Sequence, residues 1–198
     1  MGRWFKAVYF AGILIEMAVR IPYDRQRRRI RKIDQRVSAT ERGLLGGLLL
    51  GMFVLPLVYS VTPWLNFADY RLSSAAKARA GWLGSALLAA SIWLFWRAHR
   101  DLGTNWSPSL EIGEGQTLTT EGIYRHIRHP MYASQWLWSA AQALLLPNWI
   151  AGWSSFASFL PFYLSRVPNE ERMMLEHFGE AYRAYAERTG RVLPRLRG

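Results

Sequence analysis

The sequence predicts an all-α, polytopic membrane protein with about five membrane-spanning helices, a C-terminal helical hairpin and a pocket on the cytosolic side. Half of the 198 residues are apolar, and they gather in long blocks without charge. The formal net charge of +11 comes from 25 Lys and Arg against 14 Asp and Glu, and most of these cations flank the apolar blocks. Blocks of this length with cationic flanks are typical of helices that cross a bilayer.

The first three expected spans are residues 4–21, 44–61 and 81–96. The second and third approach the roughly 20 apolar residues that cross a bilayer. The first carries Lys6, Glu16 and Arg20, which a span tolerates near its ends or where they face other helices. Residues 131–146 and 149–165 are two further charge-free blocks, and Pro147-Asn148 between them predicts a sharp turn. They are expected to form a hairpin of short, tilted spans.

The distribution of Lys and Arg predicts the orientation, because cytoplasmic loops are enriched in these residues. Arg20 lies at the end of the first span, and Arg25, Arg27, Arg28, Arg29, Arg31, Lys32 and Arg36 follow it before the second span. This places the N-terminus outside and the C-terminus in the cytoplasm, although Arg3 and Lys6 oppose that orientation. The predicted location is a prokaryotic inner membrane.

The excess of positive charge alone is also compatible with nucleic-acid binding. The cations lie beside spans, where orientation and anionic lipid headgroups account for them, and no nucleic-acid motif is present. The chain has no cysteine, which excludes disulfides, thiolate metal sites and cysteine nucleophiles. We expect one domain, 1–198, with N-terminal spans in 4–96 and the chemistry in 97–198, membrane lipids as partners, and no nucleic acid or metal.

A dense polar motif occupies residues 122–132, at a predicted membrane border. Pro130 restricts His129 to an extended backbone and suits the first position of a helix, where free N–H groups favour an anion. Such a cluster beside a bilayer indicates a site. Arg128 anchored to headgroups and His129 acting as a helix cap would explain the same residues.

A second polar region, 166–172, follows the last span. Pro168 is expected to end that span near Val167, and Asn169 to cap a new helix over 170–188. Glu170 and Glu171 in its first turn would be favoured by the helix dipole alone. Alternatively, Arg166 and the two glutamates bind a ligand that carries both a positive and a negative charge. The new helix has an apolar stripe formed by Met174, Phe178, Ala181, Tyr182 and Tyr185.

A third region, 103–119, has the composition of a loop. Its backbone amides would suit a carboxylate or hydroxyl groups, but an ordinary connector has the same composition. No phosphate-binding glycine pattern is present.

These motifs occur in a fixed order: L-G-x-N-W-S, T-x-x-G-x-Y-x-x-x-R-H-P-x-Y, then E-E followed after six residues by F-G-x-x-Y-x-x-Y, and a late R-V-L-P. Over residues 102–194 this order resembles the isoprenylcysteine carboxyl methyltransferase family. The resemblance implies an integral membrane enzyme that transfers a methyl group from S-adenosylmethionine to a lipid-like or prenylated acceptor entering from the bilayer.

The resemblance also implies roles for individual residues. Arg128 and Arg166 are expected to act in catalysis, and Arg166 to contact the substrate. No residue is expected to bind a metal. The implied cofactor-binding residues are Gln116, Thr117, Leu118, Thr119, Tyr124, His129, Pro130, Met131, Tyr132 and Glu170. Ile123 and Ser134 depart from the family's usual proline and glycine, and the chain lacks the extra spans of the eukaryotic members.

The sequence leaves the acceptor open. A carboxylate needs no general base and suits a bidentate arginine, whereas an amine, as in a phospholipid N-methyltransferase, would need His129 or a glutamate as base. A sterol-reductase-type enzyme that uses NADPH is an alternative with a similar helical layout. A non-catalytic membrane protein, whose clusters serve only topology, is another.

Overall fold

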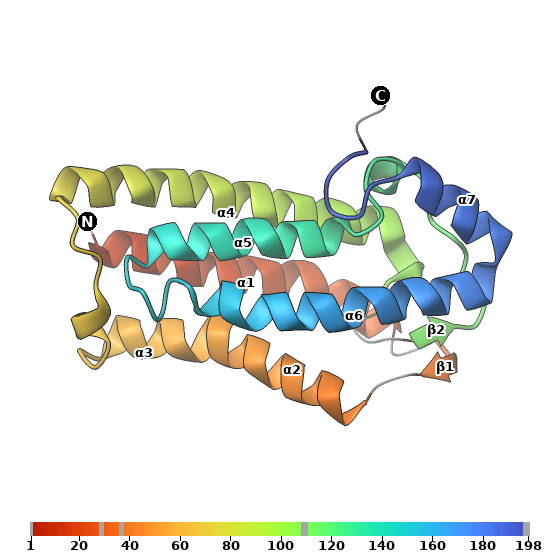
Figure 1. Cartoon of the computed structure of the whole chain (residues 1–198), viewed down its shortest axis with the longest axis horizontal. Helices are drawn as coiled ribbons and strands as arrows, with labels where there is room; N and C mark the ends of the chain where they lie inside the picture. The colour runs from red at the N-terminus through yellow and green to blue at the C-terminus, as the bar shows by residue number, and fades with distance from the viewer. Residues whose placement is uncertain (1, 28–29, 36–37, 108–110, 196–198) are drawn as a thin grey trace.

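The computed structural model describes residues 2–27, 30–35, 38–107 and 111–195. Long helices lie side by side along the long axis of the molecule, and the short elements gather at one end of the bundle (Figure 1). The helices are α1 (Gly2–Arg27), α2 (Ala39–Leu49), α3 (Leu55–Val61), α4 (Ser74–Leu102), α5 (Pro130–Leu145), α6 (Ser154–Phe178) and α7 (Glu180–Arg188). The strands are β1 (Lys32–Gln35) and β2 (Glu111–Gly113). The predominantly helical fold confirms that part of the sequence prediction.

Helices occupy most of each of the five expected apolar blocks, although residues 149–153 form turns before α6 begins. In the described part of the chain, two helical stretches are long and apolar enough to cross a membrane, Ala39–Val61 and Ser74–Asn105. The 16 residues of α5 are about 24 Å long at 1.5 Å per residue, shorter than a hydrocarbon core of about 30 Å. The number of spans therefore stays a prediction.

Glycines on α4 bring three helices into close contact. A Cβ at Gly81 would overlap the ring of Phe5 on α1, and a Cβ at Gly84 would meet Leu144 and Leu145 on α5. Small residues of this kind let membrane helices approach one another. The core beside this contact contains Phe5, Tyr9, Tyr59, Leu88, Trp138, Ala141, Leu145, Leu146 and Ala151.

A single turn of π-helix, Leu50–Val54, joins α2 to α3. Two carbonyl groups in this turn accept bonds from other helices. Gln142 of α5 donates to the Gly51 carbonyl at 2.9 Å, and the Tyr9 hydroxyl of α1 lies 2.6 Å from the Met52 carbonyl. Since Gln142 and Tyr9 are buried and also bond one another at 2.6 Å, these contacts satisfy polar groups that the apolar interior would otherwise penalise.

Two expectations about the C-terminal helices are wrong. Pro168 does not end the span, because α6 continues through Pro161 and Pro168 to Phe178. Asn169 does not cap a new helix, and its side-chain amide donates to the Ser165 carbonyl at 2.9 Å. The helix expected over 170–188 is interrupted at Gly179, whose φ of 55° separates α6 from α7. A left-handed backbone of this kind is available to glycine at little cost, and it commonly ends helices.

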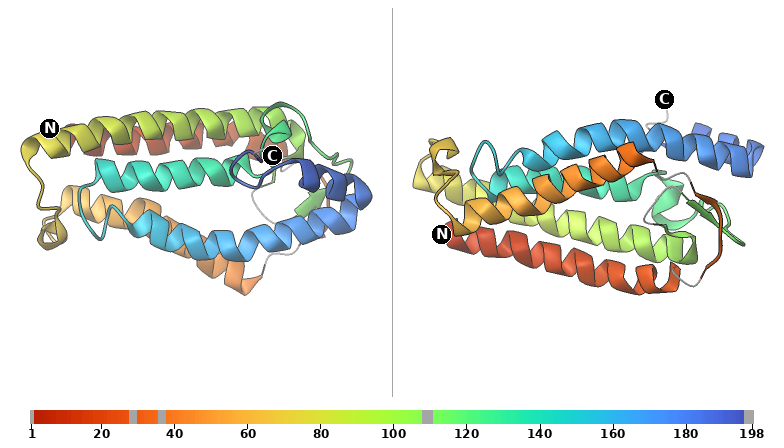
Figure 2. Two further views of the ribbon diagram at one scale, coloured as in Figure 1. Left: turned by 45° about the horizontal axis from the view of Figure 1, so that its top comes forward. Right: turned by 90° about the horizontal axis from the view of Figure 1, so that it is seen from below.

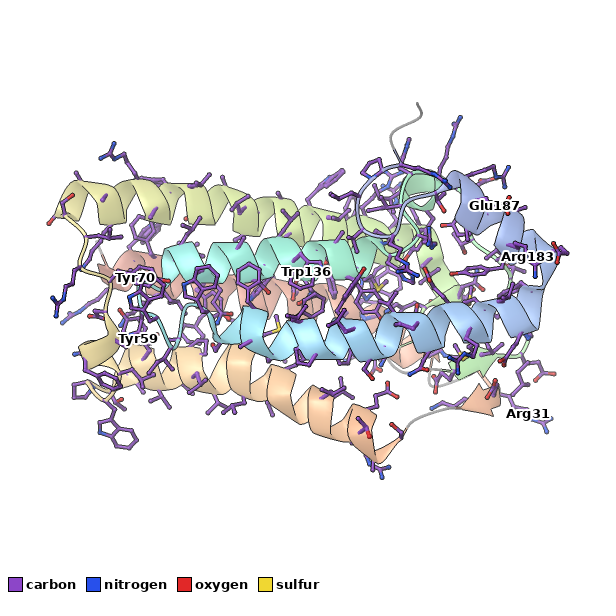
Figure 3. The ribbon with its side chains drawn as sticks, in the orientation of Figure 1. Arg31, Tyr59, Tyr70, Trp136, Arg183 and Glu187 are labelled. Carbon is purple, nitrogen blue, oxygen red and sulfur yellow. The ribbon has the colours of Figure 1, made fainter. Side chains whose placement is uncertain are left out.

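The sequence prediction contained no strand, but β1 and β2 form a short antiparallel pair. The two ends of the bundle differ in character. Arg31 and the α7 residues Arg183 and Glu187 lie at the end that carries the sheet, whereas Tyr59 and Tyr70 lie at the opposite end (Figure 3). The two further views show the same arrangement, with the sheet and α7 at the end of the bundle to which α6 extends (Figure 2). The expected site residues lie toward this polar end.

Candidate active site

A cavity of about 490 Å³ lies between the helices at the polar end. All twelve residues to which the sequence assigned a role line this one cavity: Gln116, Thr117, Leu118, Thr119, Tyr124, Arg128, His129, Pro130, Met131, Tyr132, Arg166 and Glu170. Apolar side chains of α1, α2, the π-turn and α6 form its other walls, including Leu45, Met52 and Phe159. The cavity therefore joins a polar region near the loops to an apolar region between the helices.

The entrance of α5 places the R-H-P motif against the C-terminal tail. Pro130 is the first helical residue, as expected, but His129 before it has φ −125° and ψ 59°, so its backbone is not in the extended conformation that was expected. The backbone N–H groups of Arg128 and His129 donate to the carbonyls of Gly190 and Arg191, both at 2.9 Å. The His129 side chain makes no capping hydrogen bond, so it is available to other partners.

Tyr132, Arg166 and Glu170 form a hydrogen-bonded chain across α5 and α6. The Tyr132 hydroxyl donates to Glu170 Oε2 at 2.6 Å, and Arg166 Nε donates to the Tyr132 oxygen at 2.9 Å. Arg166 also forms an ion pair with Glu41, in the first turn of α2. Both side chains of that pair are 7% exposed, and a buried charge of this kind is tolerated only when it is paired.

Glu171 is the centre of a second network. Its carboxylate accepts hydrogen bonds from Arg128 Nε at 2.7 Å, His129 Nε2 at 3.1 Å and Arg191 at 2.7 Å. Because an ionised carboxylate only accepts, the proton of His129 lies on Nε2. Burial acts to raise the pKa of Glu171, but the hydrogen bonds from His129, Arg191 and Arg128 outweigh it and hold the pKa well below its usual range.

Arg128 is held by the protein itself. Besides Glu171, its guanidinium donates to the Thr189 carbonyl at 2.5 Å and to the Ala186 carbonyl at 3.3 Å. These contacts join the R-H-P motif to α7 and the tail. Most of the donors of Arg128 are therefore used in shaping the cavity.

Asn105 of the N-W-S motif fixes the loop 116–119. Its side-chain amide donates to the hydroxyls of Thr117 and Thr119 at 3.1 and 3.0 Å, and its Oδ1 accepts from the Thr117 N–H at 3.1 Å. Gln116 turns inward on its own loop, where it accepts from the Gly113 N–H at 2.9 Å. The loop thus has a defined conformation at the cavity wall.

Three tyrosines, Tyr124, Tyr182 and Tyr185, give the polar region an aromatic wall. All three are buried, and the Tyr185 hydroxyl donates to the Tyr124 carbonyl at 2.8 Å. Burial, with a further contribution from the charge of Glu170, raises the pKa of Tyr124 well above its usual value. Burial also raises the pKa of Tyr182 and Tyr185. The wall is therefore uncharged at neutral pH and presents flat rings.

Several charged residues that line this cavity or pair with its lining residues have no role in the sequence prediction. Glu170 alone of the acidic pair is assigned to the cofactor, whereas Glu171, which pairs with Arg128, and Glu41, which pairs with Arg166, are not. Glu16 and Arg20 line the cavity from α1, although both were noted only as interruptions of a span. Ionisable residues inside an apolar helix indicate a functional site, and this signal was present in the sequence. His99, on α4, is buried with Nε2 unbonded and also lines the cavity.

The fold and the site define a helical bundle of membrane-protein character with a mixed polar and apolar cavity at one end. Within the described residues, no group of three or more His, Asp or Glu is arranged to hold a metal ion. Residues 82–176 match the sequence model of the isoprenylcysteine carboxyl methyltransferase family. This match confirms the family resemblance of the motifs.

Individual relatives agree with the family match. The chain is 34% identical over 88 residues to the human protein-S-isoprenylcysteine O-methyltransferase, which is 44% of this chain and 31% of that protein. It is 32% identical over 85 residues to the Dictyostelium discoideum enzyme of the same name, 41% of this chain and 34% of that protein. The Rattus norvegicus enzyme is 28% identical over 146 residues, 71% of this chain and 51% of the relative. The chain thus spans between about a third and a half of the length of these relatives.

A solved structure of the eukaryotic intramembrane Ras methyltransferase ICMT has a similar fold. The TM-score is 0.50 at 21% identity, over 80% of this chain and 54% of that one. The shared fold of an intramembrane protein and the two apolar helices agree with the expected membrane character of this chain.

Proposed function

We propose that this protein transfers a methyl group from S-adenosylmethionine to the carboxylate of an S-isoprenylated cysteine or a similar lipid-like acid. The observation that carries the proposal is the position of Arg166 and Glu170, one helical turn apart, where the polar and apolar regions of the cavity meet. The names of the relatives support this acceptor, since they are protein-S-isoprenylcysteine O-methyltransferases.

The residues of the polar region fit S-adenosylmethionine. The adenine ring suits the aromatic wall of Tyr124, Tyr182 and Tyr185, because flat rings stack favourably. Glu170 supplies a carboxylate for the cofactor's hydroxyl or ammonium groups, and the fixed loop 116–119 supplies backbone and hydroxyl partners. His129, Pro130, Met131 and Tyr132 complete the pocket at the start of α5. When bound, the cofactor supplies an electrophilic methyl group on a positively charged sulfur.

The chain's own contribution is to hold the acceptor and to exclude water. We expect Arg166, which lines the cavity, to orient the carboxylate of the acceptor by a bidentate contact, and the apolar walls suit a hydrocarbon chain. A carboxylate is already ionised at neutral pH, so no general base is required. Arg128 positions the R-H-P motif through its bonds to Glu171 and the tail. Positioning and a water-poor site account for the acceleration of such a displacement.

The proposal includes five membrane spans with the cavity on the cytoplasmic side of a prokaryotic inner membrane. The arginine-rich end of the bundle supports this orientation, since the segment after α1 and the tail lie at the same end (Figure 1). Membrane lipids then surround the bundle and deliver the acceptor. One domain, 1–198, combines the N-terminal spans in 4–96 with the catalytic half in 97–198.

The test uses the purified protein in detergent or lipid nanodiscs with S-adenosylmethionine carrying an isotopically labelled methyl group. Mass spectrometry should find the label as an ester on N-acetyl-S-farnesylcysteine. Label on a phospholipid amine would instead indicate a phospholipid N-methyltransferase, and binding of NADPH without S-adenosylmethionine would indicate a reductase. No labelled product and no cofactor binding would refute the proposal.

A further inference from the structure

Helix α1 contributes a second arginine to the cavity, outside the residues that match the family. Arg20 of α1 and Arg166 of α6 line the same cavity, and the charges that act on Arg20 are those of Asp24, Glu16 and, more weakly, Arg166. Two guanidinium groups that line one cavity each add a positive contribution to the potential in that space, and the Glu170 carboxylate, which also lines it, offsets part of that contribution. An anion in that space would interact favourably with both.

The partners of the two arginines differ. Arg166 is paired with Glu41 and bonded to Tyr132, whereas Arg20 forms no hydrogen bond or ion pair with any residue that the structure describes. Its guanidinium carbon lies 5.3 Å from the centroid of the Trp106 indole, and the carboxyl groups of Asp24 and Glu16 are near enough to attract it. Glu16, one turn earlier on α1, accepts a hydrogen bond from Gln135 at 3.4 Å.

The exposure and the ring contact of Arg20 suit it to bind a ligand. Its side chain is exposed and lines the cavity, so its five N–H donors are accessible to a ligand that enters. Trp106 is 3% exposed, and stacking on such a fixed ring restricts the guanidinium plane while leaving its edge donors free. The planar fork then matches the two oxygens of a carboxylate.

We propose that Arg20 binds the carboxylate of a ligand in the cavity and acts as a specificity-determining residue beside Arg166. The inference rests on the proposed function, because both reactants of that reaction carry a carboxylate: the acceptor and the amino-acid part of the cofactor. If Arg20 binds the acceptor, methylation removes the charge that both arginines recognise. The uncharged ester product should therefore bind more weakly than the acid and dissociate more readily.

The experiment compares Arg20→Gln and Arg20→Lys with Arg25→Gln, which removes an exposed charge from the same end of α1. Thermal unfolding of each variant in detergent confirms that it folds. If Arg20→Gln does not fold, Arg20→Lys, which keeps the charge but lacks the planar fork, takes its place in the binding measurements. Calorimetry measures the affinities for S-adenosylmethionine and for 5′-methylthioadenosine, which lacks the amino-acid part. Kinetics with N-acetyl-S-farnesylcysteine give KM and kcat for the acceptor.

For an acceptor contact, Arg20→Gln should raise the acceptor KM at least tenfold and leave both calorimetric affinities within about threefold. For a cofactor contact, it should weaken S-adenosylmethionine at least tenfold and leave 5′-methylthioadenosine unchanged. Arg25→Gln should behave as the wild type in every assay. The inference is overturned if Arg20→Gln changes neither ligand, or if Arg25→Gln produces the same change. A wild-type protein that binds S-adenosylmethionine but methylates no acid would refute the proposed function alone, since the calorimetric comparison still tests Arg20.

Discussion

Glu171→Gln should destabilise the protein, because it removes the charge that holds three cationic or donor groups together. The carboxylate is 15% exposed and accepts from Arg128, His129 and Arg191. Hydrogen bonds to a charged group contribute roughly 1.5–3 kcal/mol each. Arg191 is 54% exposed, so solvent screens its share, and the glutamine oxygen retains part of the remaining bonds. We expect a loss of about 3 kcal/mol, or a fall in Tm of about 6 to 12 °C for a chain of this size.

The measurement is thermal unfolding in detergent, with Glu187→Gln as the control. Glu187 lies on the exposed face of α7, so its substitution should leave Tm unchanged. The pKa of Glu171 is lowered in the folded state, so its contribution is present above the ordinary carboxyl pKa of about 4.3 and is lost as the pH falls below that value. The difference in Tm between wild type and Glu171→Gln should therefore be full at pH 7 and shrink below about pH 4. Equal Tm values at pH 7 would refute the central role of this carboxylate.

Three further predictions concern the ligands and the membrane. Glu170→Gln should weaken S-adenosylmethionine binding by about 1.5 to 3 kcal/mol in calorimetry while Glu187→Gln does not, and equal affinities would remove Glu170 from the cofactor site. Arg166→Ala should greatly slow methyl transfer yet keep the affinity for S-adenosylmethionine within about threefold. Arg166→Lys should recover little of the activity, because an ammonium group lacks the planar fork of a guanidinium. A fully active lysine variant would contradict a bidentate contact with the carboxylate. Cysteines introduced at the exposed positions Arg31 and Arg183 should react with a membrane-impermeant reagent only after the membrane is opened. A cysteine at Phe67, which is 80% exposed in the segment at the other end of the bundle, should react in intact cells. The reverse labelling pattern would invert the proposed orientation.

Much of the helical layout was predictable, because apolar blocks without charge specify helices in this setting. The continuation of α6 through Pro168 was not predictable, because a proline usually breaks a helix interior. Neighbouring helices and side-chain bonds in a membrane bundle tolerate it, as the Asn169 contact with Ser165 illustrates. The β1–β2 pair was missed because it joins two short segments about 80 residues apart and has no local pattern strong enough to indicate it.

The candidate site was predictable where motifs carried it, and all twelve assigned residues line one cavity. The hydrogen bonds and ion pairs among these residues were not predictable from their spacing along the sequence. Whether Glu170 or Glu171 meets the arginines depends on how α6 is rotated against α5, which tertiary packing decides. The contributions of Glu41 and Arg20 come from helices far earlier in the chain, and only the folded bundle brings them opposite Arg166.

The two backbone hydrogen bonds between the R-H-P motif and residues 190–191 have a consequence for biosynthesis. Each closes a separation of 62 residues, and the carbonyls that accept them follow every helix of the bundle in the order of synthesis. Contacts of such sequence separation form late, after the intervening hairpin has folded. The spans can therefore insert and pack while the entrance of α5 is still unpaired. A chain whose translation stops before Gly190 would be expected to reach the membrane with its helices in place and its ligand pocket unfinished.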